Sequence, residues 1–217
     1  HDFKTPISVI QGYAKALSDG LVPSEKQTQY LETISRKADL LNDLINTFHE
    51  YSKLEHPDYI MTFESCDICV FLRDYMAEKY SELELLGFEV DIDIPELHFI
   101  GKIDKLQLKR AFENIISNSI KHNKSGTTLY FHLIPIESHI KITIADNGCG
   151  IPPDIAQTIF EPFVVGEKSR SNKGSGLGLA ISKKIIEAHG GKISLIQPPK
   201  AEFQTQFEII LPIQEKA

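Results

Sequence analysis

The spacing of apolar residues changes once along this 217-residue chain, and the change separates two kinds of structure. Up to Tyr51, apolar residues recur at alternating intervals of three and four, as in helices that pack along a heptad seam. Beyond the segment 54–58 they alternate with polar residues over short stretches, as in strands with one buried face. Pro57 disfavours helix in the residue before it, so we expect a linker here, between domains of residues 1–56 and 57–217.

Residues 1–56 are predicted to form an antiparallel helical hairpin. Gly20 and Pro23 interrupt the helical pattern and leave a short connection between two helices. A lone hairpin cannot bury the apolar faces of both helices, so we expect a homodimer through residues 1–53 that forms a four-helix bundle. The seam residues are Phe3, Ile7, Ile10, Ala14, Leu17 and Leu21, then Leu31, Ile34, Ala38, Leu41, Ile45 and Phe48, with a neighbouring stripe of Tyr30, Lys37, Leu40, Leu44 and Tyr51.

Residues 57–217 are predicted to form a two-layer α/β sandwich, with one sheet covered on one side by helices. The alternating pattern predicts strands, and the longer periodic stretches between them predict helices. The fold class of the whole chain is therefore α+β. The strands are expected at 88–94, 129–133, 140–144 and 207–211, and the helices near 67–86, 104–122 and 176–189.

Composition excludes several classes of protein. The net charge of −7 argues against broad nucleic-acid binding. No apolar run reaches the roughly 18–20 residues that a membrane helix needs, and the chain starts at His1 rather than Met, so we expect a fragment that reaches a membrane only through upstream segments. Three cysteines are too few for a disulfide scaffold, and Cys66 and Cys69 lack a second pair for zinc, so we expect ordinary buried or half-buried thiols.

One face of the 104–122 helix carries polar groups that suit a ligand. Asn114, Asn118 and Lys121 are spaced i, i+4 and i+7, whereas the opposite face is apolar (Phe112, Ile116 and Ile120). Magnesium takes hard oxygen ligands and shares them with phosphates, so a carboxamide oxygen suits it, and the lysine would neutralise phosphate charge. The alternative is an ordinary solvated helix face.

Asp146 follows the strand that ends at Ala145, where the chain leaves the sheet. A buried carboxylate needs hydrogen-bond donors, and the exocyclic amine of adenine is one. Gly148 and Gly150 permit positive φ and leave room for a flat base beside the backbone. The alternative is an Asp-Asn-Gly turn between two strands.

Gly174, Gly176 and Gly178 precede the helical residues 179–189, and their missing side chains expose backbone N–H groups at a helix N-terminus, a natural phosphate site. The segment 164–173 before them is polar and cationic, which suits a lid over a triphosphate. The spacing matches neither a Walker P-loop nor the Gly-x-Gly-x-x-Gly dinucleotide fingerprint.

These motifs occur in a fixed order along nearly the whole chain, together with residues 1–6 (His-Asp-Phe-Lys-Thr-Pro) and 159–163 (Ile-Phe-Glu-Pro-Phe). The chain thereby resembles the catalytic core of a sensor histidine kinase of two-component signalling, with a GHKL-type ATP-binding fold. The resemblance implies magnesium-dependent autophosphorylation of a histidine by ATP and phosphorelay to an aspartate on the receiver domain of a response regulator. It implies a cytoplasmic domain, as in membrane-anchored bacterial sensor kinases, and leaves a phosphatase activity open.

The resemblance also implies roles for the residues at the start of the chain. His1 would take the γ-phosphoryl group, and Asp2 would orient the imidazole ring or accept its proton. Thr5 would position the water in a phosphatase mode, and Pro6 would bend the helix near the acceptor.

In the pocket, the resemblance makes Asn118 the principal magnesium ligand, supported by Asn114, with Lys121 on phosphate and Asp146 on the adenine amine. His122 stands where the family often has Tyr or Phe, and it can still stack on adenine or ribose. The remaining expected contacts are the lid cations Lys168, Arg170 and Lys173, the anchors Phe160 and Phe163, and the glycine-box residues Gly148, Gly150, Gly174, Ser175, Gly176, Leu177 and Gly178.

Two other functions stay open at this point: a dimer scaffold that binds nucleotide as a switch, and a gyrase- or chaperone-like ATPase of the same fold. Such ATPases carry a carboxylate where Asn114 stands. Cys149, inside the first glycine motif, is expected to be a passive packed thiol.

Overall fold

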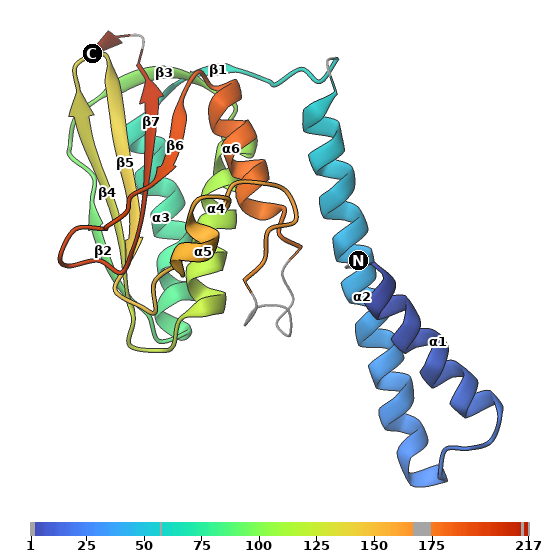
Figure 1. The fold of residues 1–217 in the computed structure, drawn as a ribbon. Helices are drawn as coiled ribbons and strands as arrows, with labels where there is room; N and C mark the ends of the chain where they lie inside the picture. The colour runs from blue at the N-terminus through green and yellow to red at the C-terminus, as the bar shows by residue number, and fades with distance from the viewer. Residues whose placement is uncertain (1–2, 57, 167–174, 214, 217) are drawn as a thin grey trace.

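A computed structural model describes residues 3–56, 58–166, 175–213 and 215–216. Helices α1 (Lys4–Ser18) and α2 (Ser24–Glu55) form the predicted antiparallel hairpin, which extends away from the rest of the chain (Figure 1). Tyr13 and Tyr30 stack across it with their ring centroids 4.4 Å apart. The prediction of a helical hairpin is confirmed.

The heptad seam of the hairpin stays open to solvent in a single chain. Leu21 is 74% exposed and Leu31 is 58% exposed, although both are large and apolar. By contrast, Leu44, from the neighbouring stripe, is buried. One chain therefore uses the stripe for its own packing and leaves much of the seam uncovered.

Pro6 lies within α1 and is buried, and the bend expected there stays a prediction. One expectation about this region is wrong in the described residues. Helix α2 continues through Glu55, so the first two residues of the expected linker are helical. No described helix has the length and apolar character required to cross a membrane.

The larger sheet has five strands in the order β2-β4-β5-β7-β6. Strand β2 pairs with β4 in parallel, and the other neighbours are antiparallel. Four of these strands were predicted, and β6 was missed. The bounds are β2 (Glu89–Asp93), β4 (Thr128–Ile136), β5 (His139–Asp146), β6 (Lys192–Leu195) and β7 (Thr205–Pro212).

Helices α3 (Ile68–Leu85), α4 (Lys105–His122) and α6 (Gly178–Ala188) cover one face of this sheet, close to the predicted ranges (Figure 1). Alternate strand residues and the apolar helix faces meet in one core, where the rings of Phe112 and Phe131 pack edge to face. The predicted two-layer α/β sandwich is confirmed, and with it the α+β class.

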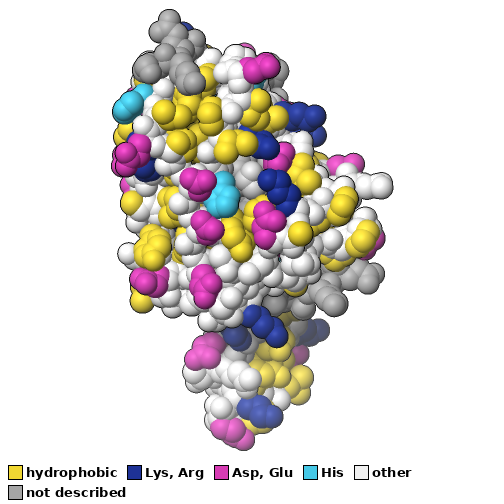
Figure 2. Space-filling view, turned by 90° about the vertical axis from the view of Figure 1, so that its left-hand side faces the viewer, with side chains coloured by type: hydrophobic (Ala, Val, Ile, Leu, Met, Phe, Trp, Pro, Cys, Tyr) yellow, Lys and Arg dark blue, Asp and Glu magenta, His cyan; other side chains and the backbone are white. Residues whose placement is uncertain are grey.

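None of the described helices covers the opposite face of the sheet (Figure 1). That face carries an ion pair between neighbouring strands, Lys141 with Glu208 at 3.4 Å, and His132 Nε2 lies 3.3 Å from the carboxylate of Asp91. Figure 2 shows this side of the molecule, with acidic, basic and apolar side chains interspersed on it. One face of the sheet is thus buried by helices and the other is exposed to solvent, which explains the alternation of apolar and polar residues along the strands.

A smaller three-stranded sheet was not predicted. It has the order β1-β3-β8, with β1 (Glu64–Asp67), β3 (Phe99–Ile103) and β8 (Glu215–Lys216), and a short helix α5 (Pro153–Ala156) follows β5. A side chain at Gly101 would approach Ile68 Cδ1 to 2.6 Å, so glycine lets this strand lie close to α3 without displacing that side chain.

His189, just after α6, makes hydrogen bonds that connect the ends of two helices. Its Nε2 accepts a hydrogen bond from the backbone N–H of Asp104 at 3.0 Å, and its Nδ1–H donates to the carbonyl of Ile185 at 2.7 Å. The carboxylate of Asp104 in turn accepts from the N–H groups of Gln107 and Thr62. These bonds join the end of α6, the start of α4 and the segment that follows the hairpin.

The hairpin contacts the sandwich through the last turns of α2. Arg110 of α4 lies 2.6 Å from the carboxylate of Glu50, and Lys184 of α6 pairs with Glu55. Lys184 also lies over the ring of Tyr51, 5.6 Å from its centroid. The contact thus combines these charged pairs with apolar packing, because Tyr51 and Leu54 of α2 also pack against the core.

Candidate functional site

Helix α4 has the two faces that its sequence predicts. Asn114 and Asn118 are half-buried and Lys121 is exposed, whereas Phe112 and Ile116 are fully buried against the sheet. The carboxylate of Asp104 caps the helix and accepts from the N–H of Gln107 at 3.1 Å. The polar face therefore remains available beside α6 and the end of β5.

Asn114 joins α4 to the start of α6. Its Nδ2 donates to the carbonyl oxygen of Gly178 at 3.0 Å, and a side chain at Gly178 would stand 3.6 Å from Asn114 Cγ. Ser182 adds a second link, because its hydroxyl donates to the carbonyl of Ala111 at 2.9 Å. The carboxamide nitrogen of Asn114 is thus used within the fold.

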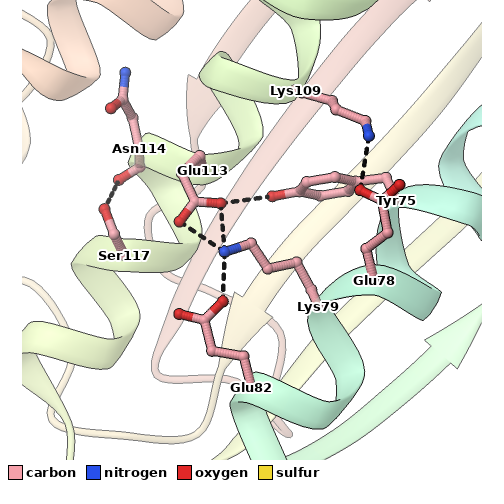
Figure 3. A network of polar contacts seen from close by, with 8 residues as sticks. All are labelled: Tyr75, Glu78, Lys79, Glu82, Lys109, Glu113, Asn114 and Ser117. Carbon is pink, nitrogen blue, oxygen red and sulfur yellow. Dashed lines mark hydrogen bonds and ion pairs between the residues drawn. The ribbon is translucent and has the colours of Figure 1, made fainter.

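The preceding residue of α4, Glu113, connects α4 to α3 on the other side (Figure 3). Lys79 of α3 lies between the carboxylates of Glu113 and Glu82, at 2.9 Å and 2.7 Å, and the hydroxyl of Tyr75 donates to Glu113 at 3.4 Å. Burial and the nearby Glu113 carboxylate raise the pKa of Tyr75 far above its usual value. Burial alone would lower the pKa of Lys79, but its bonds to the two glutamates outweigh burial and raise it. The sequence analysis assigned no role to Glu113, although it immediately precedes Asn114.

Asp146 ends β5 and is only 2% exposed. Its Oδ2 accepts a hydrogen bond from Ser119 Oγ at 2.8 Å, and its Oδ1 accepts from the N–H of Gly148 at 3.1 Å. Among the described residues no Lys, Arg or His pairs with it. Ser119, one residue after Asn118, was not predicted as part of the site.

The turn after Asp146 is correct in outline, but one of its glycines works differently from the prediction. Gly150 has the expected positive φ of 72°. Gly148 does not, and a side chain there would approach the Asn123 carboxamide oxygen to 1.9 Å. Asn123 thus lies beside Gly148, and its carboxamide oxygen accepts from the N–H of Cys149 at 2.9 Å. Cys149 itself is exposed, not packed as expected.

The second glycine motif packs against the segment that precedes the predicted lid. Gly176 has φ of 64°, and a side chain there would lie 2.7 Å from the carbonyl carbon of Phe163. The N–H of Phe163 donates to the carbonyl of Gly176 at 2.9 Å. Leu177 is buried, and its N–H donates to Ser175 Oγ at 3.2 Å. The predicted contacts Lys168, Arg170, Lys173 and Gly174 lie outside the described residues.

The two phenylalanines of the 159–163 segment face different neighbours. Phe160 packs on Phe207 of the core sheet, with ring centroids 6.0 Å apart. Phe163 is 47% exposed, and its ring lies 6.5 Å from that of Phe48 on α2. The ring centroid of Phe48 in turn lies 6.4 Å from that of Phe3. A line of aromatic contacts thus runs from the second glycine motif to the start of α1.

The predicted acceptor residues His1 and Asp2 lie outside the described residues. Thr5 is exposed in the first turn of α1, beside Lys4. Lys121 and His122 are also exposed, at the end of α4.

The described residues fit magnesium and ATP chemically. Asp146 has unused acceptor positions for an amine, because a carboxylate offers about four and only two are taken. Asn118 is a half-buried carboxamide on the same helix, and its oxygen is a hard ligand. No group of three or more His, Cys, Asp or Glu side chains able to hold a metal occurs in the described part of the chain.

Comparisons with known proteins agree with this arrangement. Residues 103–215 match the family "Histidine kinase-, DNA gyrase B-, and HSP90-like ATPase", and residues 1–57 match the "His Kinase A (phospho-acceptor) domain". The sensor protein GtcS of Aneurinibacillus migulanus is 34% identical over 98% of this chain and 59% of its own length. The sensor histidine kinase YcbM of Bacillus subtilis is 35% identical over 97% of this chain and 68% of its own.

A solved structure has a similar fold over nearly the whole chain. The histidine kinase ThkA, in complex with the response regulator protein TrrA, gives a TM-score of 0.73 at 21% identity, over 99% of this chain and 59% of that one. The chain thus spans about three fifths of GtcS and of ThkA.

Proposed function

The chain belongs to the sensor histidine kinase family, and from that premise we propose that it transfers the γ-phosphoryl group of ATP to His1 and then to an aspartate of a response regulator. Transfer to His1 leaves ADP and a phosphohistidine. Transfer from the phosphohistidine to the aspartate restores the imidazole.

One observation carries this proposal: a single helix, α4, is hydrogen-bonded to both ends of the candidate nucleotide site. Asn114 bonds to Gly178 at the start of the α6 helix, and Ser119 bonds to Asp146 at the acidic turn. Asn118 lies between them on the same helix. An adenine at the acidic turn and phosphates at the helix start would therefore lie along one rigid element.

The roles we propose follow from the chemistry of each group. Asp146 accepts a hydrogen bond from the exocyclic amine of adenine, and His122 stacks on the base or ribose. Asn118 would hold magnesium through its carboxamide oxygen, aided by Asn114, and the ion would neutralise phosphate charge. Lys121 and the lid cations Lys168, Arg170 and Lys173 add further positive charge. Catalysis then consists of positioning and of charge stabilisation in a loose transition state.

The acceptor end completes the proposal. Asp2 orients the His1 ring or takes its proton, and Thr5 positions water when phosphate is removed from the regulator. We further propose that residues 1–56 form the phosphotransfer and dimerisation domain and residues 57–217 the ATP-binding domain. The exposed seam, with Leu21 and Leu31 mostly open to solvent, supports a homodimer, since a second copy would bury it.

A response regulator receiver domain is the proposed partner, by analogy with the complex of ThkA with TrrA. We place the chain in the cytoplasmic part of a membrane-anchored protein. This proposal follows from the resemblance to sensor kinases, in which segments outside the matched region would provide the membrane attachment.

Incubation of the chain with γ-labelled ATP and magnesium tests the proposal. We expect acid-labile, alkali-stable label on the protein, because phosphohistidine has that stability, and no label on His1→Gln. Label that survives acid would point to a serine or threonine acceptor instead. Hydrolysis of ATP without any labelled protein would favour an ATPase of the same fold.

A further inference from the structure

We propose that Ser119 is a positioning residue for the base: it orients the Asp146 carboxylate toward the exocyclic amine of adenine. The inference rests on the proposed function, because it takes the nucleotide at this site to be ATP. It adds a residue that none of the sequence motifs assigned to the pocket.

The contact is short and sheltered. Ser119 Oγ lies 2.8 Å from Asp146 Oδ2, and the two residues are 6% and 2% exposed. The backbone carbonyl of Ser119 accepts from the N–H of Asn123, so the residue is fixed within the last turn of α4. A hydrogen bond to a charged acceptor is worth more than one between neutral groups, and removing it from water strengthens it further.

The two donors to Asp146 differ in what they fix. The N–H of Gly148 belongs to the turn that Asp146 itself begins, so it moves with the carboxylate. The hydroxyl of Ser119 comes from α4, the helix that also carries Asn118. Of the two, only Ser119 holds the carboxylate in register with the phosphate side of the site.

A hydroxyl also suits the task better than a cation. Lys or Arg at this position would neutralise the carboxylate and compete with the amine of the base. A neutral donor occupies one acceptor position of Oδ2 and leaves the negative charge to attract the amine. Asp146 is thereby preorganised, and less of the binding free energy is lost in ordering it.

Two nucleotides separate this role from a purely structural one. ATP has the exocyclic amine, and purine riboside triphosphate has the same ring nitrogens and phosphates without it. Titration calorimetry in magnesium buffer would give the Kd of each for wild type and Ser119→Ala. We expect wild type to prefer ATP by about tenfold or more, the scale of one charge-assisted hydrogen bond. Ser119→Ala should reduce that preference by roughly five- to tenfold, almost wholly through weaker ATP binding.

Three variants complete the design. Ser182→Ala removes another fully buried hydroxyl, one that bonds only to backbone carbonyls, so it should leave the preference for ATP unchanged. Ser119→Thr keeps a hydroxyl on the same carbon and should restore the preference. In an Asp146→Asn background, Ser119→Ala should no longer change the preference, because coupled residues are non-additive. Circular dichroism of each variant checks that it is folded.

The outcomes are distinct. The proposal would be overturned if Ser119→Ala weakened the binding of both nucleotides equally, or left the Kd of ATP unchanged. Additive effects of the changes at positions 119 and 146 on the preference for ATP would also overturn it. If wild type bound the two nucleotides equally, Asp146 would not read the amine, and the base-binding part of the proposed function would fail with it. Phosphohistidine labelling is a separate measurement and could still succeed in that case.

Discussion

The carboxamide nitrogen of Asn114 donates a hydrogen bond to the carbonyl oxygen of Gly178, 3.0 Å away, and so fastens the middle of α4 to the first residue of α6. The adjacent Glu113 bonds to Lys79 of α3. Two consecutive residues thus hold α4 between its two neighbouring helices, and changes at Asn114 should affect the fold as well as any bound nucleotide.

Asn114→Asp is expected to lower the free energy of unfolding by roughly 1–3 kcal/mol, because it replaces the amide donor with an oxygen that faces the Gly178 carbonyl. Urea denaturation of the nucleotide-free protein measures this loss. Asn46→Asp, at an exposed position on α2, makes the same chemical change and should stay within about 0.5 kcal/mol. Equal effects of the two changes would show that the Asn114 bond contributes nothing.

Asn118→Ala is expected to abolish labelling by γ-labelled ATP while leaving the circular dichroism spectrum unchanged. The residue is half-buried on the polar face of α4, and its loss would remove the oxygen that we assign to magnesium. Robust phosphorylation of this variant would refute that assignment.

The stability of the chain is expected to fall in acid because of His189. Burial lowers the pKa of this imidazole in the folded chain below its usual value, and its Nε2 is occupied as an acceptor. The unfolded chain therefore binds more protons below about pH 6.5, so the contribution of His189 is complete above that pH and is lost as the pH falls through the lowered pKa.

Comparing the unfolding free energies of wild type and His189→Gln at pH 7.5 and 5.5 isolates this effect, since other titrating groups cancel. The difference in unfolding free energy between wild type and His189→Gln should shrink at the lower pH, by at most about 1.4 kcal/mol per pH unit. An advantage that grew in acid would contradict the assigned direction.

Gly176→Ala is expected to destabilise the chain by roughly 1–3 kcal/mol. Its φ of 64° disfavours a side chain, and the new methyl group would meet the Phe163 backbone at 2.7 Å. Gly12→Ala is the matched control, because it lies within α1 and the added carbon would meet no packing neighbour within 4 Å outside the local helix backbone in the described residues. That change should stabilise the helix by about 0.5–1 kcal/mol. Thermal melts of both variants would test this contrast. The prediction is contradicted if both changes shift the melting temperature in the same direction.

The major elements were predictable because each has a long, regular pattern. The buried face of α4 and the alternation along β4 and β5 follow from local spacing alone. Strands β1, β3 and β6 have only four or five residues, and their pairing depends on partners far along the chain. Strands β1 and β3 also lack the clean alternation that marks the equally short β2, and β6 alternates over only four residues. No local signal marks them strongly.

The site divides in a similar way. Asn114 and Asp146 stand out because large polar groups sit in a regular pattern, whereas Ser119 is a small residue that is common in helices. Its importance comes from the approach of β5, which the sequence does not encode locally. Gly148 was expected to have a positive φ, which the structure does not show, and only the structure reveals that Asn123 lies beside it.

The two bonds from α4 also define a length. Asn114 and Ser119 are five residues apart, which corresponds to about 7.5 Å along a helix axis. A helix cannot stretch or shorten without breaking its own backbone bonds, so it acts as a ruler between the acidic turn and the glycine-rich helix start. Inserting a single residue between them would rotate one contact by about 100° relative to the other, and the two ends of the site would no longer face the same ligand.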